Sequence, residues 1–263
     1  MSEVGIIEFN DLEIGNMLMQ NNTNLVSVEC SFPKLKTGRS MFEMCTKLTS
    51  WNIKLSNLTD GSYMFRNCSS LSSFDGDLSS LINGYHMFSG AALTSWNIKL
   101  SNLTDGSYMF RFNDFVSFDS DLKNLNTGSF MFYGCENLES FNGESLSELT
   151  NGIFMFYGCT ALASFDGDLS KLDNGTSMFE ECENLTSFNG DLSSLTNGTS
   201  MFRKTKLISW DKDLSNLTNG YEMFENTPLE SFSGDLSSLN DGGGMFHNTK
   251  LTSFTLIKNN SNS

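Results

Sequence analysis

The amino-acid sequence predicts a mainly β fold, a solenoid of about eleven coils, and three observations support it. The dipeptide Met-Phe recurs along the chain at spacings of 22 to 24 residues. A stretch of 19 residues, Leu48 to Arg66, is repeated without change as Leu93 to Arg111. Each unit also carries Leu, an aromatic residue, Met and Phe at nearly fixed offsets. Units this short cannot bury such side chains alone, so they are expected to stack on one another.

The Met-Phe dipeptides define the extent of the repeat array. They begin at Met41, Met64, Met87, Met109, Met131, Met155, Met178, Met201, Met223 and Met245. Met17-Leu18 starts a degenerate further unit. The sequence therefore predicts an N-terminal cap over residues 1–16, a solenoid over residues 17–254 and a C-terminal tail over residues 255–263.

The strand of each coil is expected at the motif Ser-Phe-x-Gly, with Trp sometimes in place of Phe. Side chains alternate between the two faces of a strand, so the aromatic residue and the Gly should face the core while Ser and the intervening polar residue face solvent. Phe74, Phe165 and Phe188 are predicted to be buried on this basis. An Asn-Gly or Asp-Gly dipeptide in most units predicts a turn in which the backbone takes a positive φ.

The cysteines occupy one repeat position. Five of the six follow Met-Phe at the same offset: Cys45, Cys68, Cys135, Cys159 and Cys182. Disulfides or a metal site are one interpretation, and a column of buried free thiols is the other. A run of three neighbours cannot pair completely, and no Cys-x-x-Cys motif is present, so the sequence favours free thiols.

The outward side of the strands is the predicted binding face. Its residues are Ser73, Asp75, Ser117, Asp119, Ser164, Asp166, Ser187, Asn189, Ser209 and Asp211. Asn and Asp alternate along eight units, which separates like charges and lets an Asn amide donate to the Asp beside it. Such a polar surface suits many hydrogen bonds to a partner, but it equally suits a solvated face.

An acidic ridge is predicted on the later coils. Asp168, Asp191, Asp213 and Asp235 occupy one position in successive units, with no cation between them at that position. Ca²⁺ favours clustered carboxylate oxygens and would relieve the repulsion. The alternative is a plain acidic ridge without metal, and no other cofactor is expected.

Charge and motifs exclude several functions. The chain has 31 acidic against 16 basic residues and a net charge of −15, which disfavours binding to nucleic acid or to anionic membranes. The N-terminal segment lacks the features of a secretory signal, and no apolar run is long enough to insert into a membrane. No catalytic motif is found, so the sequence predicts a protein that is not an enzyme.

These repeats resemble the BspA-like leucine-rich repeats. The resemblance rests on Leu185-Thr-Ser-Phe188, Met178-Phe179 and Cys182, and it extends over about residues 17–254. It implies a right-handed leucine-rich-repeat-like β-solenoid with a role in recognition or surface adhesion, and members of the family also occur in phage structural proteins.

The resemblance, taken with the N-terminus, favours a phage virion- or tail-associated protein for attachment or decoration. Such a protein would be synthesised in the cytoplasm and reach the virion or the extracellular surface without a signal peptide. Its partners would be a protein or glycan ligand, including other virion proteins. The alternative is a bacterial surface adhesin, whole or in part, that binds a host matrix protein or glycan.

Overall fold

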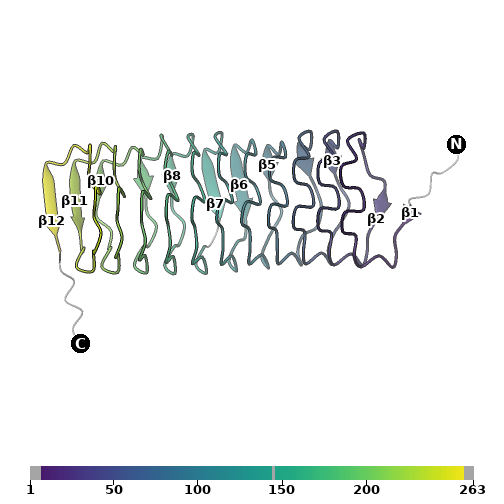
Figure 1. The fold of residues 1–263 in the computed structure, drawn as a ribbon, viewed down its shortest axis with the longest axis horizontal. Helices are drawn as coiled ribbons and strands as arrows, with labels where there is room; N and C mark the ends of the chain where they lie inside the picture. Colours follow the sequence, from purple (N-terminus) through teal and green to yellow (C-terminus); the bar gives the residue numbers. More distant parts are fainter. Residues whose placement is uncertain (1–6, 144–145, 258–263) are drawn as a thin grey trace, which may run out of the picture.

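The computed structural model describes residues 7–143 and 146–257, and it forms a straight, elongated solenoid (Figure 1). In these residues there is no helix, and hence none long and apolar enough to cross a membrane. The short strands follow one another along the long axis in chain order, with the two ends of the chain at opposite ends of the solenoid. The strands are β1 (Ile7–Glu8), β2 (Cys30–Ser31), β3 (Ser50–Trp51), β4 (Ser73–Phe74), β5 (Ser95–Trp96), β6 (Ser117–Ser120), β7 (Ser140–Gly143), β8 (Ser164–Phe165), β9 (Ser187–Phe188), β10 (Ser209–Trp210), β11 (Ser231–Gly234) and β12 (Ser253–Leu256).

Neighbouring coils pair in parallel and in register, so equivalent residues of the repeat lie side by side. Ser117 pairs with Ser140, and Phe118 with Phe141. A second row of parallel bridges links each coil to the next at the residue before the conserved Gly, from Ile14 through to Asp241. The predicted β-solenoid is therefore confirmed, and the repeat period equals one coil.

The coil count is slightly lower than the sequence predicts. The solenoid has about nine turns, against the predicted eleven. At the two ends, residues at core positions remain exposed: Leu18 at 43% and Phe254 at 51%. In the first unit Leu18 and Met19, not Met17 and Leu18, align with Met-Phe, because the Met19 N–H bonds Met41 O as the Phe42 N–H bonds Met64 O.

The core is a column of identical layers. In the inner coils, the Leu residues of the repeat, both residues of each Met-Phe dipeptide and the Cys that follows it are almost completely buried. The Phe of each Met-Phe dipeptide stacks on its equivalent, for instance Phe132 on Phe156 at 5.4 Å and Phe156 on Phe179 at 5.3 Å between ring centroids. The strand aromatics Phe74, Phe165 and Phe188 are buried as predicted, at 8%, 1% and 6% exposed. They pack against this column edge to face.

The Gly of the Asn-Gly or Asp-Gly dipeptide has a steric role, and the expectation of a positive φ there is wrong. At Gly84, a Cβ would lie 2.7 Å from Met109 Sδ, which belongs to the next coil. The positive φ occurs two residues later, at His86, where φ is 56°. A side chain at the Gly would occupy the space of the Met, so close contact between coils selects the Gly.

Replacing Gly84 by Ala should destabilise the fold by about 1 to 3 kcal/mol, because the added methyl overpacks a buried site. Met109 is 0% exposed and has little room to move away. Urea denaturation measures the change, with Gly158→Ala as a control: at Gly158 a Cβ meets only Gly134 Cα at 3.9 Å, although a positive φ of 69° adds a backbone cost. If Gly84→Ala is as stable as the wild type, the steric explanation fails.

All six cysteines are free thiols, and the five at the repeat position are buried. Each of these donates from Sγ to a backbone carbonyl of the preceding coil, as Cys159 does to Phe132 O at 3.2 Å. Burial raises the pKa of Cys68 and of Cys135 to about 12. Where Cys is replaced, Thr205 and Asn113 also donate to carbonyl groups, whereas Ala91 at the same position is buried without a side-chain donor, so a donor is common here and not required.

Candidate interaction surfaces

The structure places the predicted binding face along the row of strands. All ten of its residues are exposed, and Ser and Asn/Asp form two parallel rows across successive coils. Asn189 Nδ2 donates to Asp166 Oδ1 at 2.6 Å, which is the amide-to-carboxylate contact that the alternation predicts. The face is thus arranged as expected, and whether it binds a partner stays a prediction.

The four aspartates of the acidic ridge have a structural role. Each accepts the backbone N–H two residues later: Asp168 from Ser170, Asp191 from Ser193, Asp213 from Ser215 and Asp235 from Ser237, at 2.8 to 2.9 Å. This is the turn geometry that selects Asp and Asn. Asp235 is only 4% exposed and does not extend the exposed ridge. Turn formation thus explains the residue type without a metal.

No cluster of three or more His, Cys, Asp or Glu side chains suited to a metal ion occurs within residues 7–143 and 146–257. The carboxylates for which the sequence left open either Ca²⁺ or a plain acidic ridge are engaged in separate turns, one in each coil. The Ca²⁺ site therefore has no geometric support.

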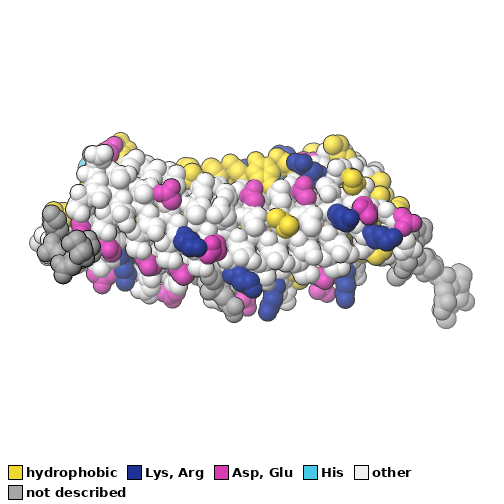
Figure 2. Space-filling view, turned by 90° about the horizontal axis from the view of Figure 1, so that it is seen from below, with side chains coloured by type: hydrophobic (Ala, Val, Ile, Leu, Met, Phe, Trp, Pro, Cys, Tyr) yellow, Lys and Arg dark blue, Asp and Glu magenta, His cyan; other side chains and the backbone are white. Residues whose placement is uncertain are grey.

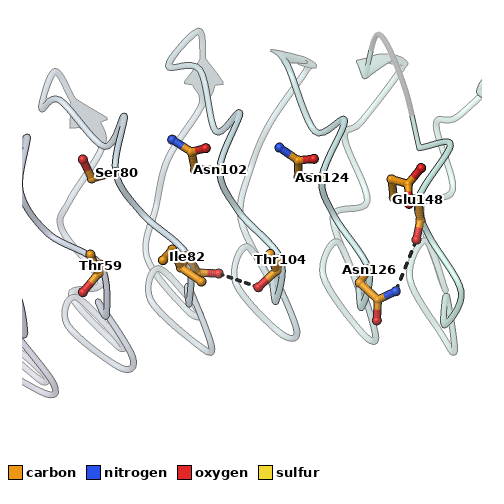
Figure 3. A pocket seen from close by; sticks show the side chains of 8 residues that line it. All are labelled: Thr59, Ser80, Ile82, Asn102, Thr104, Asn124, Asn126 and Glu148. Carbon is orange, nitrogen blue, oxygen red and sulfur yellow. Dashed lines mark hydrogen bonds between the residues drawn. The ribbon is translucent and has the colours of Figure 1, made fainter.

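A shallow groove of about 550 Å³, lined mostly by residues with polar side chains, runs across several coils (Figure 3). Its lining residues are Thr59, Ser80, Ile82, Asn102, Thr104, Asn124, Asn126 and Glu148. The amide nitrogens of Asn102 and Asn124 are already used, because they donate to Ser79 O and Ser101 O at 2.7 Å. No aromatic ring is among the lining residues, so the groove offers hydrogen bonds but no stacking platform for a sugar.

A second surface, which we name the aromatic edge, follows the Met-Phe segments. It consists of Tyr63, Tyr85, His86, Tyr108, Phe112, Phe130, Tyr133, Phe154 and Tyr157, together with Arg66 and Arg111. Phe112 is the most exposed of these side chains, at 49%, and the others are half-buried. Figure 2 shows a band of hydrophobic side chains along one long edge of the molecule, with basic side chains beside it.

Five rings of the aromatic edge form one continuous stack. His86 lies between Tyr63 and Tyr108, with centroids 5.1 and 4.3 Å away. Phe130 continues the stack from Tyr108 at 4.5 Å, and Phe154 follows at 4.8 Å. Because ring faces contact one another, the stack turns ring edges outward, and those edges carry partial positive charge.

The rings of this stack lie on a strained backbone. The residue directly before each Met-Phe dipeptide has a positive φ, including Tyr63 at 60°, Tyr108 at 59° and Phe130 at 58°. This conformation costs a residue other than Gly about 1 to 2 kcal/mol, and Gly244 occupies the equivalent position in the last unit. Ser177 at 52° and Glu222 at 54° share this conformation, so the repeat itself imposes the positive φ and fixes where the rings lie.

His86 is held neutral by its surroundings. Burial, then the positive charges of Arg66 and Arg111, lowers the pKa of His86 to about 4, against a small opposing effect of Glu43. The imidazole therefore carries no charge at neutral pH.

Acid should destabilise the wild type more than a His86→Phe variant. The folded pKa lies below the unfolded value, so between about pH 6.5 and pH 4 only the unfolded chain takes up this proton, and stability falls as the pH falls. Since His86 is partly exposed, we expect a discounted difference of about 1 kcal/mol at pH 5. Urea denaturation at pH 7 and pH 5 measures it, and a wild-type-to-variant difference that is independent of pH would contradict this explanation.

The aromatic edge was missed by sequence reasoning, which treated the Met-Phe segment only as core. The signal was available in the residues next to the dipeptide, where Tyr, Phe and His follow one another in five successive units from Tyr63 to Phe154. The rest of the repeat is rich in Ser, Asn and Asp, so this local change in composition marks the edge.

Comparison with known families agrees with the geometry. The model of the BspA-type leucine-rich repeat region matches residues 6–116, 36–163 and 155–262, which together span nearly the whole chain. The chain belongs to the BspA-type leucine-rich repeat family. Repeats of this family are typically recognition scaffolds without enzymatic activity.

A leucine-rich repeat protein from Bacteroides ovatus ATCC 8483 has a similar fold, with a TM-score of 0.53 and 21% sequence identity. The similarity covers 98% of this chain and 74% of that protein. None of the curated proteins is similar in sequence to the chain. At this identity the likeness supports the leucine-rich-repeat fold alone, so the binding surface is argued from the residues of this chain.

Proposed function

We propose that this BspA-type solenoid is a non-enzymatic scaffold that binds a protein partner through its aromatic edge. The observation that carries the proposal is the continuous stack of rings held at positive φ, with Arg66 and Arg111 beside it. Aromatic residues and Arg dominate the energetics of protein interfaces, whereas Ser and Asp, which dominate the strand face, are depleted there.

Rigidity supports the same surface. Every coil of the Met-Phe segment is tied to the next by backbone hydrogen bonds, such as Tyr63 N–H to Tyr85 O at 2.8 Å and Phe65 N–H to Met87 O at 2.8 Å. A rigid row of partly buried rings loses little conformational entropy when a partner binds.

Binding by variants tests which surface is used. The double variant Phe112→Ser, Tyr133→Ser alters the aromatic edge, and Asp119→Ser alters the strand face of the same coils. We expect the edge variant to bind its target about tenfold or more weakly, and the strand-face variant to bind as the wild type does. The targets are purified phage particles, intact bacterial cells and immobilised host matrix proteins. If only the strand-face variant loses target binding, the binding site lies on the strand face that the sequence predicted.

The setting is part of the proposal. Attachment or decoration of a phage virion or tail is the setting that the sequence analysis favours, and a bacterial surface adhesin is the alternative. An antibody against the chain distinguishes them: labelling of gradient-purified phage particles supports the first, and labelling of phage-free intact cells supports the second.

A further inference from the structure

Two buried polar atoms on the aromatic edge have no hydrogen-bond partner. They are His86 Nδ1 and Arg111 Nε, and no other buried side-chain nitrogen or oxygen in the described part of the chain shares this property. The two residues lie on adjacent coils, which are joined by bonds from His86 N–H to Ser107 O at 3.0 Å and from Gly90 N–H to Arg111 O at 2.8 Å. A buried polar atom left without a partner costs about 1 to 3 kcal/mol. Two such nitrogens on adjacent coils therefore require a physical explanation.

Arg111 differs from the other arginines that directly follow a Met-Phe dipeptide. Arg66 bonds Glu43 Oε1 of the preceding coil at 3.1 Å. Arg203 bonds Glu180 at 2.6 Å and Glu225 at 2.7 Å, on the coils before and after it. At the equivalent position of the coil before Arg111 the residue is Ser89, and within residues 7–143 and 146–257 no ion pair is formed by Arg111.

The internal duplication makes this a matched comparison. Arg66 and Arg111 end the two identical stretches of 19 residues, so their local sequences are the same. Only the neighbouring coils differ, with Glu43 below Arg66 and Ser89 below Arg111. The arginine of the first copy therefore has a carboxylate partner on the preceding coil, and the arginine of the second copy has none there.

The surroundings of Arg111 orient its guanidinium. Its Cζ lies 4.2 Å from the ring centroid of Phe112 and 5.1 Å from that of Tyr133. Aromatic contact on two sides restricts the side chain and limits water, which strengthens a bond to a carboxylate. The outward ring edges of the stack add partial positive charge. The site is thus locally positive on a chain of net charge −15.

We propose that Arg111 and Ser89 bind a carboxylate side chain of the protein partner, in the position that Glu43 takes beside Arg66. The partner segment recognised here is acidic, with aromatic or apolar neighbours that contact Phe112 and Tyr133. The inference rests on the proposed function, since it assigns the chemistry of the partner at the same edge.

An internal carboxylate tests the geometry without any partner. Ser89→Glu places the acid where Glu43 stands relative to Arg66, and Glu43 is itself only 9% exposed, so the repeat accommodates this side chain. We expect Ser89→Glu to raise the melting temperature relative to Ser89→Gln. The difference should shrink in an Arg111→Gln background and vanish when Arg66→Gln is added, because Arg66 lies beside Ser89 on the preceding coil. Equal melting temperatures of the Glu and Gln variants would overturn the proposal.

A peptide tests the binding directly. The probe is an acetylated, amidated Tyr-Glu-Tyr peptide, with Tyr-Gln-Tyr as the neutral control and sodium acetate alone as the free carboxylate. By NMR titration we expect the Glu peptide to bind about tenfold or more tightly than the Gln peptide. Arg111→Gln should abolish this preference, whereas Arg39→Gln, which removes the same charge elsewhere, should keep it.

The outcomes separate the two proposals. If both peptides bind equally, or Arg111→Gln keeps the preference, the carboxylate site is rejected, while the edge remains the binding surface provided that Phe112→Ser, Tyr133→Ser still loses the target. If that double variant binds its target normally, the proposed function fails whatever the peptides do. If acetate alone saturates the site as well as the Glu peptide does, the site is a free-anion site and the acidic partner segment is rejected.

Discussion

Truncation of Phe156 to Ala should destabilise the solenoid by about 3 to 5 kcal/mol, the usual cost of removing a buried aromatic side chain. Phe156 is 0% exposed and lies in the middle of the array. Its ring stacks on Phe132 and Phe179 and meets Phe141 edge to face at 4.9 Å. One substitution therefore disturbs three coils.

The position along the array should also matter. Stability in repeat proteins is approximately a sum of units and of their nearest-neighbour interfaces, so a weak central coil should let the two halves unfold separately. Phe254→Ala is the matched control, because Phe254 is 51% exposed in the last strand and its loss should cost about 1 kcal/mol or less. Equal losses for the two variants, each in a single transition in urea, would contradict a stack of locally coupled coils.

Replacement of Arg203 by Met should destabilise the fold by about 3 kcal/mol, because it leaves buried carboxylates without a cation. The side chains of Glu180 and Glu225 are only 9% and 12% exposed, and Arg203 bonds both. His247 and Arg203 lower the pKa of Glu225 despite its burial, which shows that the carboxylate is stabilised in its charged form. We place the loss at the lower end of the range for buried pairs, since Arg203 remains 29% exposed.

Two variants control this experiment. Lys204→Met breaks the neighbouring pair with Glu181 at 2.6 Å, whose side chains are 40% and 32% exposed, and should cost about 0.5 kcal/mol. Adding Glu180→Gln to Arg203→Met should recover part of the loss, because it removes one of the two stranded charges. If Arg203→Met and Lys204→Met cost the same in urea denaturation, the bridging arginine contributes no more than an exposed pair.

The fold could be predicted from the sequence because each repeated pattern is compatible with only one arrangement of stacked coils. The period of 22 to 24 residues equals one coil, and the Ser-Phe-x-Gly motif orients each strand, so Phe165 is buried and Asp166 exposed as predicted. The thiols of Cys135 and Cys159 are free and buried for the same reason, since one repeat position meets one environment throughout the array.

The candidate site followed much less closely. The four aspartates of the ridge read as a charge cluster in the sequence, yet in the structure each satisfies a turn N–H in its own coil. The aromatic edge was hidden beside a core motif, and its stacking depends on contacts between residues about one period apart, such as His86 and Tyr108. The repeat spacing shows which residues occupy equivalent positions in successive coils, but it does not show the hydrogen-bond partner of each polar group.

The sequence by itself determined the repeat, the stacking of coils and the inward or outward direction of each strand residue, because these depend on short-range periodicity and on burial of apolar side chains. Only the tertiary structure showed which side chain of the neighbouring coil each residue contacts. Gly84 accommodates Met109, Arg66 meets Glu43, and the same arginine in the second identical copy, Arg111, meets Ser89. These outcomes depend on contacts made across the stack, so two stretches with identical residues take different chemical roles.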